Sequence, residues 1–228
     1  MTSSEILIQV ENISRNYYLD KTEVCALDNV SFQICRGDFV VLAGPSGSGK
    51  TTLLNVIGCI DKPTLGKVFF EGMDITDTPL EKLNYLRLKK IGFIFQTFNL
   101  IPVLTAFENI ELPLLFKGYD QKTIKDLAGK YLERVGLSDK RDQRPSTLSC
   151  GQRQRLAIAR ALAGSPSLIV ADEPTASLDR KNATSIIELL RELNDEFAVT
   201  VVLASHDPMV IEHSKTKLFM RDGRVVSK

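Results

Sequence analysis

The chain has 228 residues, of which 43% are hydrophobic and 25% charged, a composition typical of a folded protein that buries a substantial core. This length suits one large domain, or one domain with a smaller lobe. The formal net charge of +1 gives no support to a protein that coats nucleic acid or an anionic membrane, and we expect no nucleic-acid partner.

Neither a membrane span nor a secretion signal is expected. No apolar run approaches the roughly 18 residues that a transmembrane helix needs, and residues 1–5 lack the basic and apolar regions of a signal peptide. The cysteines show no C-x-x-C pairing, which favours reduced thiols in a cytoplasmic protein over a disulfide or zinc framework. They are Cys25, Cys35, Cys59 and Cys150.

The first 37 residues predict β-structure. Residues 6–10 form an apolar strand candidate, and residues 30–34 alternate as a half-buried strand does. Tyr17 and Tyr18 lie between them. Because neighbours on a strand face opposite ways, at most one of the two can stack on a ligand, and a packing role for each is the alternative.

A phosphate-binding loop follows. Residues 44–51, Gly-Pro-Ser-Gly-Ser-Gly-Lys-Thr, match the pattern G-x-x-x-x-G-K-[ST]. They stand between an apolar strand at 38–43 and a helix that continues through 52–57, whose N-terminal end attracts anions. Glycines let backbone N–H groups surround an anion, Lys50 supplies a positive charge to the phosphates, and Thr51 supplies a hydroxyl ligand for Mg²⁺. A chance glycine-rich turn is the alternative reading.

The next segments predict further sheet. A turn at 63–66 and a strand at 67–72 suggest a small antiparallel sheet beside the nucleotide. Residues 91–96 form a buried strand that ends in Gln96. Ligands of open α/β sheets bind at the carboxyl ends of strands, so Gln96 is a candidate site residue, with an ordinary loop residue as the alternative.

From about residue 97 to 146 the sequence predicts a helical insertion. Residues 105–118 have helical periodicity that Pro113 is expected to break or bend. Residues 121–135 form an amphipathic helix. Several apolar residues crowd the connection before them, either as core or as the lining of a groove for a partner's helix. These are Phe95, Phe98, Leu100, Ile101 and Leu104.

Polar residues then begin or end three further elements. Ser149 has the chemistry of an N-cap for the helix that runs to residue 163, and the first turn of that helix offers a second anion site, with an ordinary capped helix as the alternative. The strand at 168–173 ends in Asp172, which suits a Mg²⁺ site, and Glu173, which suits activation of water. The strand at 198–204 is followed by His206, and residues 217–226 predict a terminal hairpin.

The order and spacing of these segments resemble the nucleotide-binding subunit of ATP-binding cassette transporters over essentially the whole chain. Residues 44–51 look like the Walker A motif, Gln96 like the Q-loop, and residues 148–152 like the signature motif. Residues 168–173 are similar to the Walker B strand with its catalytic glutamate, residues 176–179 to the D-loop, and His206 to the switch histidine.

The resemblance implies an α/β fold: a P-loop NTPase (RecA-like) core with an antiparallel β-subdomain and a helical subdomain insertion. One ATPase domain would cover residues 1–228. About residues 1–96 and 165–228 would form the core with the β-subdomain, and about 97–164 the helical subdomain with the signature motif.

The resemblance also implies the site. Its cofactors would be ATP and Mg²⁺, its catalytic residues Glu173, His206, Lys50 and Gln96, and its metal-site residues Thr51, Gln96 and Asp172. The nucleotide base would contact Tyr17, which fits the spacing to Leu27 better than Tyr18 does. The phosphates would contact the loop residues Gly44, Pro45, Ser46, Gly47, Ser48, Gly49, Lys50, Thr51 and Thr52. The signature and D-loop residues would reach the ATP of a second subunit; these are Ser149, Gly151, Gln152 and Asp179.

Two partners are implied: a second copy in a head-to-tail ATP-dependent dimer, and an integral membrane permease, which places the chain on the cytoplasmic face of the membrane. Residues 95–102, with Glu108 and Asn109, are similar to the subgroup serving lipoprotein release, macrolide or peptide export, and cell-division permeases. Signalling through a permease without transport, and a soluble DNA-repair ATPase, are the alternatives.

One residue departs from the family pattern. Cys150 stands where the signature motif usually has glycine. If the backbone there required a positive φ or very close approach to phosphate, the cysteine Cβ would cost about 1 kcal/mol or more. Ser149, Gly151 and Gln152 are retained, so we expect a working site whose dimer is weakened at most.

Overall fold

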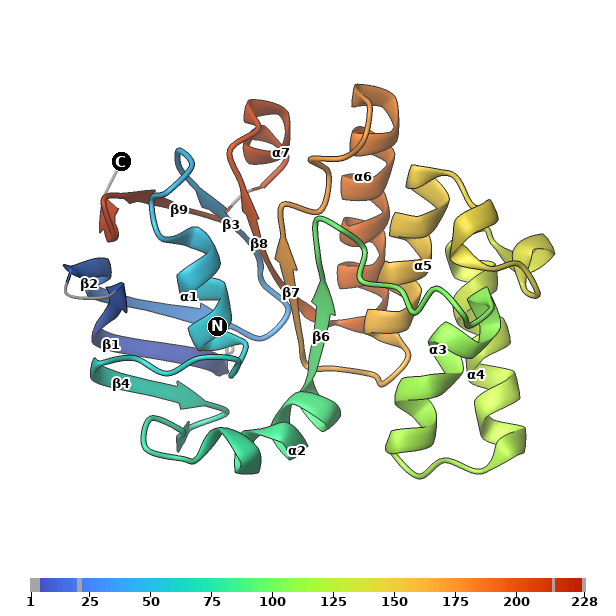
Figure 1. Cartoon of the computed structure of the whole chain (residues 1–228), viewed down its shortest axis with the longest axis horizontal. Helices are drawn as coiled ribbons and strands as arrows, with labels where there is room; N and C mark the ends of the chain where they lie inside the picture. Colours follow the sequence, from blue (N-terminus) through green and yellow to red (C-terminus); the bar gives the residue numbers. More distant parts are fainter. Residues whose placement is uncertain (1–4, 20–21, 215, 227–228) are drawn as a thin grey trace.

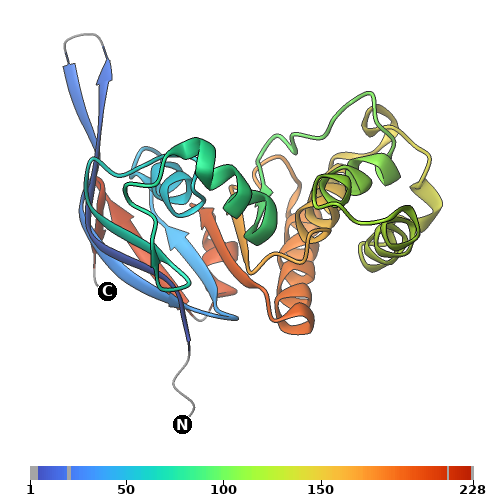
Figure 2. The ribbon, with the colours of Figure 1, turned by 90° about the horizontal axis from the view of Figure 1, so that it is seen from below.

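An antiparallel sheet forms one side of the molecule. The computed structural model describes residues 5–19, 22–214 and 216–226. The sheet has the order β2-β1-β4-β5, and a long hairpin of two 14-residue strands supplies its first two members. Its strands are β1 (Ile6–Leu19), β2 (Thr22–Cys35), β4 (Leu65–Phe70) and β5 (Met73–Asp74). In Figure 2 the hairpin end projects beyond the rest of the molecule.

A six-stranded sheet with the order β10-β9-β3-β8-β7-β6 lies at the centre. Its neighbours from β9 to β6 pair in parallel, and only the terminal β9–β10 hairpin is antiparallel. The strands are β3 (Phe39–Ala43), β6 (Ile91–Ile94), β7 (Leu168–Asp172), β8 (Thr200–Ser205), β9 (Thr216–Arg221) and β10 (Arg224–Val226).

The apolar strand sequences are explained by burial on both faces of this sheet. In β3, Val40 and Leu42 belong to one hydrophobic core, whereas Val41 and Ala43 belong to another. Successive side chains of a strand point to opposite faces, so a strand with two covered faces needs an uninterrupted apolar run. One core joins the antiparallel sheet and α1 (Lys50–Ile57) to the central sheet, and the other joins the helices to its opposite face.

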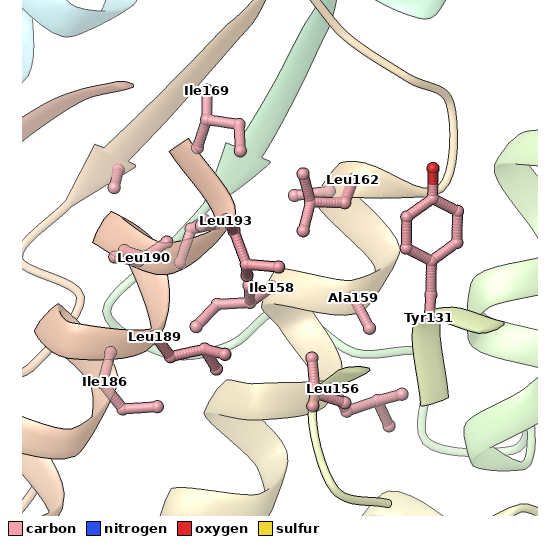
Figure 3. Close-up of a cluster of buried hydrophobic side chains, with 14 of the residues drawn as sticks. Tyr131, Leu156, Ile158, Ala159, Leu162, Ile169, Ile186, Leu189, Leu190 and Leu193 are labelled. Atoms are coloured by element: carbon pink, nitrogen blue, oxygen red, sulfur yellow. The ribbon is translucent and has the colours of Figure 1, made fainter. Parts of the chain in front are cut away.

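Helices α4, α5 and α6 meet in the second core, where Tyr131, Leu156 and Leu190 are among the buried side chains (Figure 3). Figure 1 shows α3 and α4 at the far side of α5 from the central sheet. The helices are α2 (Leu80–Lys90), α3 (Ala106–Phe116), α4 (Gln121–Arg134), α5 (Cys150–Leu162), α6 (Arg180–Phe197) and α7 (Pro208–Glu212), with short 3₁₀ turns at Ser138–Lys140 and Pro145–Thr147. Within the described ranges, none of the helices combines the length and the apolar character that crossing a membrane requires.

The structure confirms the predicted combination of an α/β core, an antiparallel sheet and a helical segment, and it corrects three details. The hairpin strands β1 and β2 are much longer than the predicted strands at 6–10 and 30–34, and β8 begins at Thr200 because Ala198 adopts a left-handed conformation that ends α6. Of the two outcomes expected at Pro113, a break is excluded, because α3 continues to Phe116. Helix α2, in which only Leu83 is buried, was not predicted.

A buried amide holds the start of α3. Asn109 is fully buried; its Oδ1 accepts from the Ile101 N–H at 2.9 Å, and its Nδ2 donates to the carbonyls of Ile101, Leu104 and Thr105 at 2.9–3.2 Å. One side chain therefore makes hydrogen bonds to four backbone groups of the connection between β6 and α3, of which the Ile101 and Thr105 carbonyls also accept from backbone N–H groups.

Replacing this side chain should destabilise the protein. We expect Asn109→Leu, which keeps the volume but removes the donors and the acceptor, to lower the free energy of unfolding by about 2–3 kcal/mol in urea denaturation, since half-buried backbone groups such as the Ile101 N–H and the Leu104 carbonyl lose the hydrogen bond that Asn109 makes to them. Leu115→Ala, at an exposed position of the same helix, is the control and should cost much less. A loss for Asn109→Leu no larger than that of the control would contradict this account.

Candidate nucleotide-binding site

The carboxyl ends of β3, β8, β7 and β6 open into one hollow of about 480 Å³. Ten of the residues predicted for the site line it: Ser46, Gly47, Gly49, Lys50, Thr51, Thr52, Gln96, Asp172, Glu173 and His206. Val24, Cys25, Ala26 and Ala176 complete the lining. None of these four was predicted for the site: Val24, Cys25 and Ala26 lie in β2, outside the predicted strands at 6–10 and 30–34.

Two glycines of the phosphate-binding loop are required by close approach. A Cβ on Gly44 would lie 2.3 Å from the Met220 carbonyl oxygen. Gly49 has φ +99°, and a Cβ there would lie 2.5 Å from the Ala26 carbonyl oxygen. The loop therefore packs directly on the neighbouring backbone, and no side chain caps the first turn of α1, which leaves its N–H groups for an anion.

Two polar groups of the loop suit a phosphate. The Ser48 Oγ is buried without a hydrogen-bond partner, which is costly unless a ligand supplies one. Lys50 is only 6% exposed, and its ammonium donates to the Gly44 and Pro45 carbonyls at 2.8 and 2.9 Å. Its Nζ also lies 3.8 Å from the Glu173 carboxylate. The positive charge is thus held at the mouth of the loop.

The residues next to the loop suit a magnesium ion bound chiefly through phosphate. The Thr51 hydroxyl donates to Asp172 Oδ1 at 3.2 Å, and Gln96 lines the same hollow, so hydroxyl, carboxylate and amide oxygens converge. Among the described residues there is no group of three His, Cys, Asp or Glu side chains that would hold a metal by itself. This pattern matches Mg²⁺, which takes few protein ligands together with substrate phosphates.

Asp172 is electrostatically unfavourable where it lies. Burial raises its pKa above the usual range, the Thr51 hydrogen bond and Lys50 oppose the rise, and the neighbouring Glu173 carboxylate adds to it. A cation bound at this position would relieve the cost of both effects.

Glu173 and His206 form a pair across two strands. Glu173 follows β7 with φ +45°, a left-handed conformation that is rare for glutamate, and its N–H donates to the Ala204 carbonyl at 3.1 Å. Its Oε1 lies 2.9 Å from Nδ1 of His206, which follows β8 and is 62% exposed at the side chain. Backbone strain of this kind is concentrated at functional sites. The pair therefore presents a carboxylate and an imidazole to the hollow.

The signature and D-loop residues lie outside this hollow. Ser149 caps α5, as predicted, and exchanges hydrogen bonds with Gln152 in a capping box. Asp179 caps α6 by accepting from the Asn182 N–H at 2.9 Å, and a Cβ on Gly151 would lie 3.2 Å from the Asn182 side chain. The two motifs are thus neighbours on one surface.

The concern about Cys150 is partly removed. Cys150 is the first residue of α5 and does not have a positive φ, so its side chain causes no backbone strain. Cys150 is exposed, and its Sγ lies 3.2 Å from the guanidinium of Arg153.

Tyr17 does not line the hollow but lies beside it. It pairs with Val24 across the hairpin, and residues directly opposite each other point to the same face of a sheet. Val24 lines the hollow, so Tyr17 is on that face, whereas Tyr18 pairs with Glu23 and is 71% exposed. Cys25 also lines the hollow and pairs with Asn16, whose side chain shares the face of Tyr18, so the register does not choose between the two tyrosines, and the base contact of Tyr17 stays a prediction.

Comparison with known proteins identifies the family. The ABC transporter family model matches residues 27–176. An uncharacterised ABC transporter ATP-binding protein of Thermotoga maritima is 44% identical over 96% of this chain and 93% of that protein. The macrolide export ATP-binding/permease protein MacB of Syntrophobacter fumaroxidans is 43% identical over 95% of this chain, but the chain spans only 31% of that protein.

A solved structure gives the same answer. The ATP-binding cassette MJ0796 of Methanocaldococcus jannaschii, a dimer in a post-hydrolysis state bound to ADP and Pi, resembles this chain with a TM-score of 0.89 and 42% identity, and the match covers 97% of both chains.

The raised pKa of Asp172 leads to a prediction about stability. We expect Asp172→Asn to raise the free energy of unfolding of the ligand-free protein at neutral pH, because the amide still accepts from Thr51 but carries no charge. A carboxyl group whose pKa is higher in the folded than in the unfolded protein stabilises the fold at pH values below its unfolded pKa. That contribution is lost as the pH rises through the folded pKa. The difference between variant and parent should therefore grow from acid to neutral pH in urea titrations.

Asp126→Asn, at an exposed position of α4, provides the matched control. Its difference from the parent should stay small across the same pH range. A less stable Asp172→Asn at neutral pH would contradict the electrostatic argument.

Proposed function

Because the chain belongs to the ABC transporter family and is an ATPase of that family, we propose that it is the ATP-hydrolysing subunit of a transporter, which closes with a second copy of itself around ATP and acts on a membrane permease. One observation carries the proposal: Lys50, Asp172, Glu173 and His206 converge in the same hollow from three neighbouring strands. The chain would form a single ATPase domain, with about residues 97–164 as its helical subdomain.

The proposed chemistry is attack of water on the γ-phosphate. The amides of residues 46–52 and the Lys50 ammonium bind the phosphates, and the Ser48 Oγ gains the partner that it lacks. Thr51, Asp172 and Gln96 would hold Mg²⁺, which supplies positive charge that offsets the charge of the phosphates. Phosphoryl transfer depends mainly on such positioning and charge stabilisation.

Glu173 acts on the attacking water and His206 on the γ-phosphate. The Glu173 carboxylate orients the attacking water and accepts its proton, and its unusual backbone conformation aims it into the hollow. His206, 2.9 Å from that carboxylate, steadies the γ-phosphate and fixes the carboxylate in place.

The second copy is supported by the position of the signature motif. Ser149, Gly151 and Gln152 lie outside the hollow of their own chain, yet the first turn of α5 offers free N–H groups to an anion. A head-to-tail partner would bring these groups, with Asp179, to the γ-phosphate, and a single chain would be a slow catalyst without them.

The permease is proposed to dock in a second, apolar hollow of about 340 Å³ between α2, β6, α3 and α5. Phe93, Phe95 and Phe116 line it, together with Arg87, Lys117 and Arg160, and none of its described lining residues carries a carboxylate. Burial and the neighbouring Lys89 and Lys90 lower the pKa of Lys117 to about 8. This charge pattern favours a permease helix that combines an apolar side chain with a carboxylate.

The type of permease is inferred from relatives. MacB of Syntrophobacter fumaroxidans joins an ATP-binding part to a permease in one protein, and this chain matches its ATP-binding third. We propose a permease of the lipoprotein-release or macrolide-export type, with the chain peripheral on the cytoplasmic face of the membrane. Transport is distinguished from signalling through a cell-division permease by whether ATP turnover moves a cargo across the membrane.

Removing the proposed base should separate binding from turnover. We expect Glu173→Gln to bind ATP, to lose ATP turnover by about two orders of magnitude or more, and to shift from monomer to dimer when ATP is added, as read by size exclusion with light scattering. Retained turnover would refute the role of Glu173.

The signature motif is tested in the same background. Adding Ser149→Arg should abolish the ATP-induced dimer and leave ATP binding by the monomer intact, because the added side chain blocks the partner's phosphates. Cys150→Gly in the Glu173→Gln background shows whether the cysteine weakens closure: equal dimer affinity removes the concern.

Docking should depend on the exposed aromatic side chain at the rim of the apolar hollow. Phe116 is 69% exposed, and Phe116→Ser should reduce recovery of the permease with the tagged chain from detergent-solubilised membranes by about tenfold, in line with the apolar area lost. The permease is identified by mass spectrometry as a multi-span protein. Leu65→Ser, at an exposed leucine of β4, should change neither recovery nor ATP affinity. Full recovery with Phe116→Ser would exclude this surface.

A further inference from the structure

A single carboxylate ties the β1–β2 hairpin to the segment that follows α1. Asp61 accepts two hydrogen bonds from the Arg15 guanidinium, from Nε at 2.9 Å and from Nη2 at 2.8 Å. The Tyr17 hydroxyl donates to the same carboxylate at 2.8 Å. The side chains of Arg15 and Asp61 are 24% and 20% exposed, so this bidentate pair is partly shielded from water.

Asp61 is in turn fixed to the helix that begins at the phosphate-binding loop. The N–H groups of Ile60 and Asp61 both donate to the Asn55 carbonyl of α1, at 2.8 and 3.1 Å. The carboxylate therefore has a defined position relative to α1, whose opposite end begins at Lys50 in the phosphate-binding loop.

The same segment supports the hairpin where the sheet no longer does. Pairing of β4 with β1 ends at Ser14 and Leu65. Beyond that point Thr64 takes over: its N–H donates to the Ser14 carbonyl at 2.7 Å, and its hydroxyl accepts from the Asn16 N–H at 3.0 Å. Residues 61–64 thus hydrogen-bond to β1 where the hairpin in Figure 2 begins to project from the sheet.

Arg15 also occupies one face of the aromatic ring. Its guanidinium carbon lies 4.6 Å from the centroid of the Tyr17 ring. A base that stacks on Tyr17 must therefore use the opposite face, and it would complete a stack of guanidinium, phenol ring and purine.

We propose that Asp61 is a positioning residue for the nucleotide base: through Arg15 and the Tyr17 hydroxyl, it fixes the stacking ring at a set distance from the phosphate-binding loop. This inference rests on the proposed function, in which Tyr17 contacts the base. Asp61 contacts no nucleotide itself, so its loss weakens binding of ligands that carry a base and spares ligands that consist of phosphate alone.

The test compares Mg²⁺–ADP with Mg²⁺–pyrophosphate, which lacks both base and ribose, by calorimetry on the full chain. ADP avoids turnover. Asp61→Ala should weaken ADP binding about two- to tenfold, the range of an aromatic stacking contact, and leave pyrophosphate binding unchanged. Asp61→Asn, which keeps one carbonyl acceptor, should fall between Asp61→Ala and the parent.

A matched control exists in this chain. Glu71 is 22% exposed at the side chain and accepts hydrogen bonds from two side chains, those of Arg36 and Lys90. Asp61 likewise accepts from two side chains, those of Arg15 and Tyr17. Glu71 does not line the nucleotide-binding hollow, so Glu71→Ala should change neither affinity. Tyr17→Phe, which keeps the ring and removes only the hydroxyl, should reproduce part of the Asp61→Ala loss even if Asp61→Ala proves too unstable to purify.

The outcomes are distinct. Equal ADP affinity in parent and Asp61→Ala, or an equal loss for ADP and pyrophosphate, overturns the inference. If Tyr17→Ala weakens ADP binding and Asp61→Ala does not, the inference fails while the role of Tyr17 stands. If Tyr17→Ala has no selective effect, the base contact and this inference fail together, and if the parent binds neither ligand, the proposed function fails. Support requires the selective loss and no further loss when Asp61→Ala is added to Tyr17→Ala.

Discussion

The register of the parallel strands decides where each charged group of the nucleotide-binding hollow lies. Ala43 of β3 pairs with Ser205 of β8, and Asp172 of β7 pairs with Ala204. The phosphate-binding loop, the acidic pair and His206 therefore leave the sheet at one level. A slip of one residue would send every side chain of the strand to the opposite core, so the packing that stabilises the sheet also fixes the site.

This arrangement places charge where burial makes it costly. Lys50 is nearly buried, Asp172 has a raised pKa, and Glu173 has a strained backbone. Backbone carbonyls of the loop and the His206 imidazole offset part of that cost in the ligand-free protein. A nucleotide with its metal ion would supply the remaining counter-charges. Relief of the electrostatic cost in the free protein would then contribute to the free energy of binding.

The features that local pattern determines were predictable from the sequence. Apolar runs that end in Gln96, Asp172 or His206 predicted the strands and the edge at which they meet, and Ser149 predicted a helix cap. Features that depend on tertiary contacts were not predictable. Helix α2 buries little and has no strong periodicity, Pro113 stays within α3, and the link from Asp61 to Tyr17 joins residues 44 positions apart. The division into subdomains and the roles of the individual site residues stay predictions.

Phe98 and Asn99 both adopt left-handed conformations, with φ +63° and +48°, and Arg160 donates to both of their carbonyls. This turn follows Gln96, which lines the nucleotide-binding hollow, and its own residue Asn99 lines the apolar hollow. Two consecutive residues in that conformation carry backbone strain, which the hydrogen bonds from Arg160 help to hold in place. By thermodynamic reciprocity, if occupancy of the apolar hollow shifts this turn enough to change nucleotide affinity by some factor, nucleotide binding must change affinity for the occupant by the same factor.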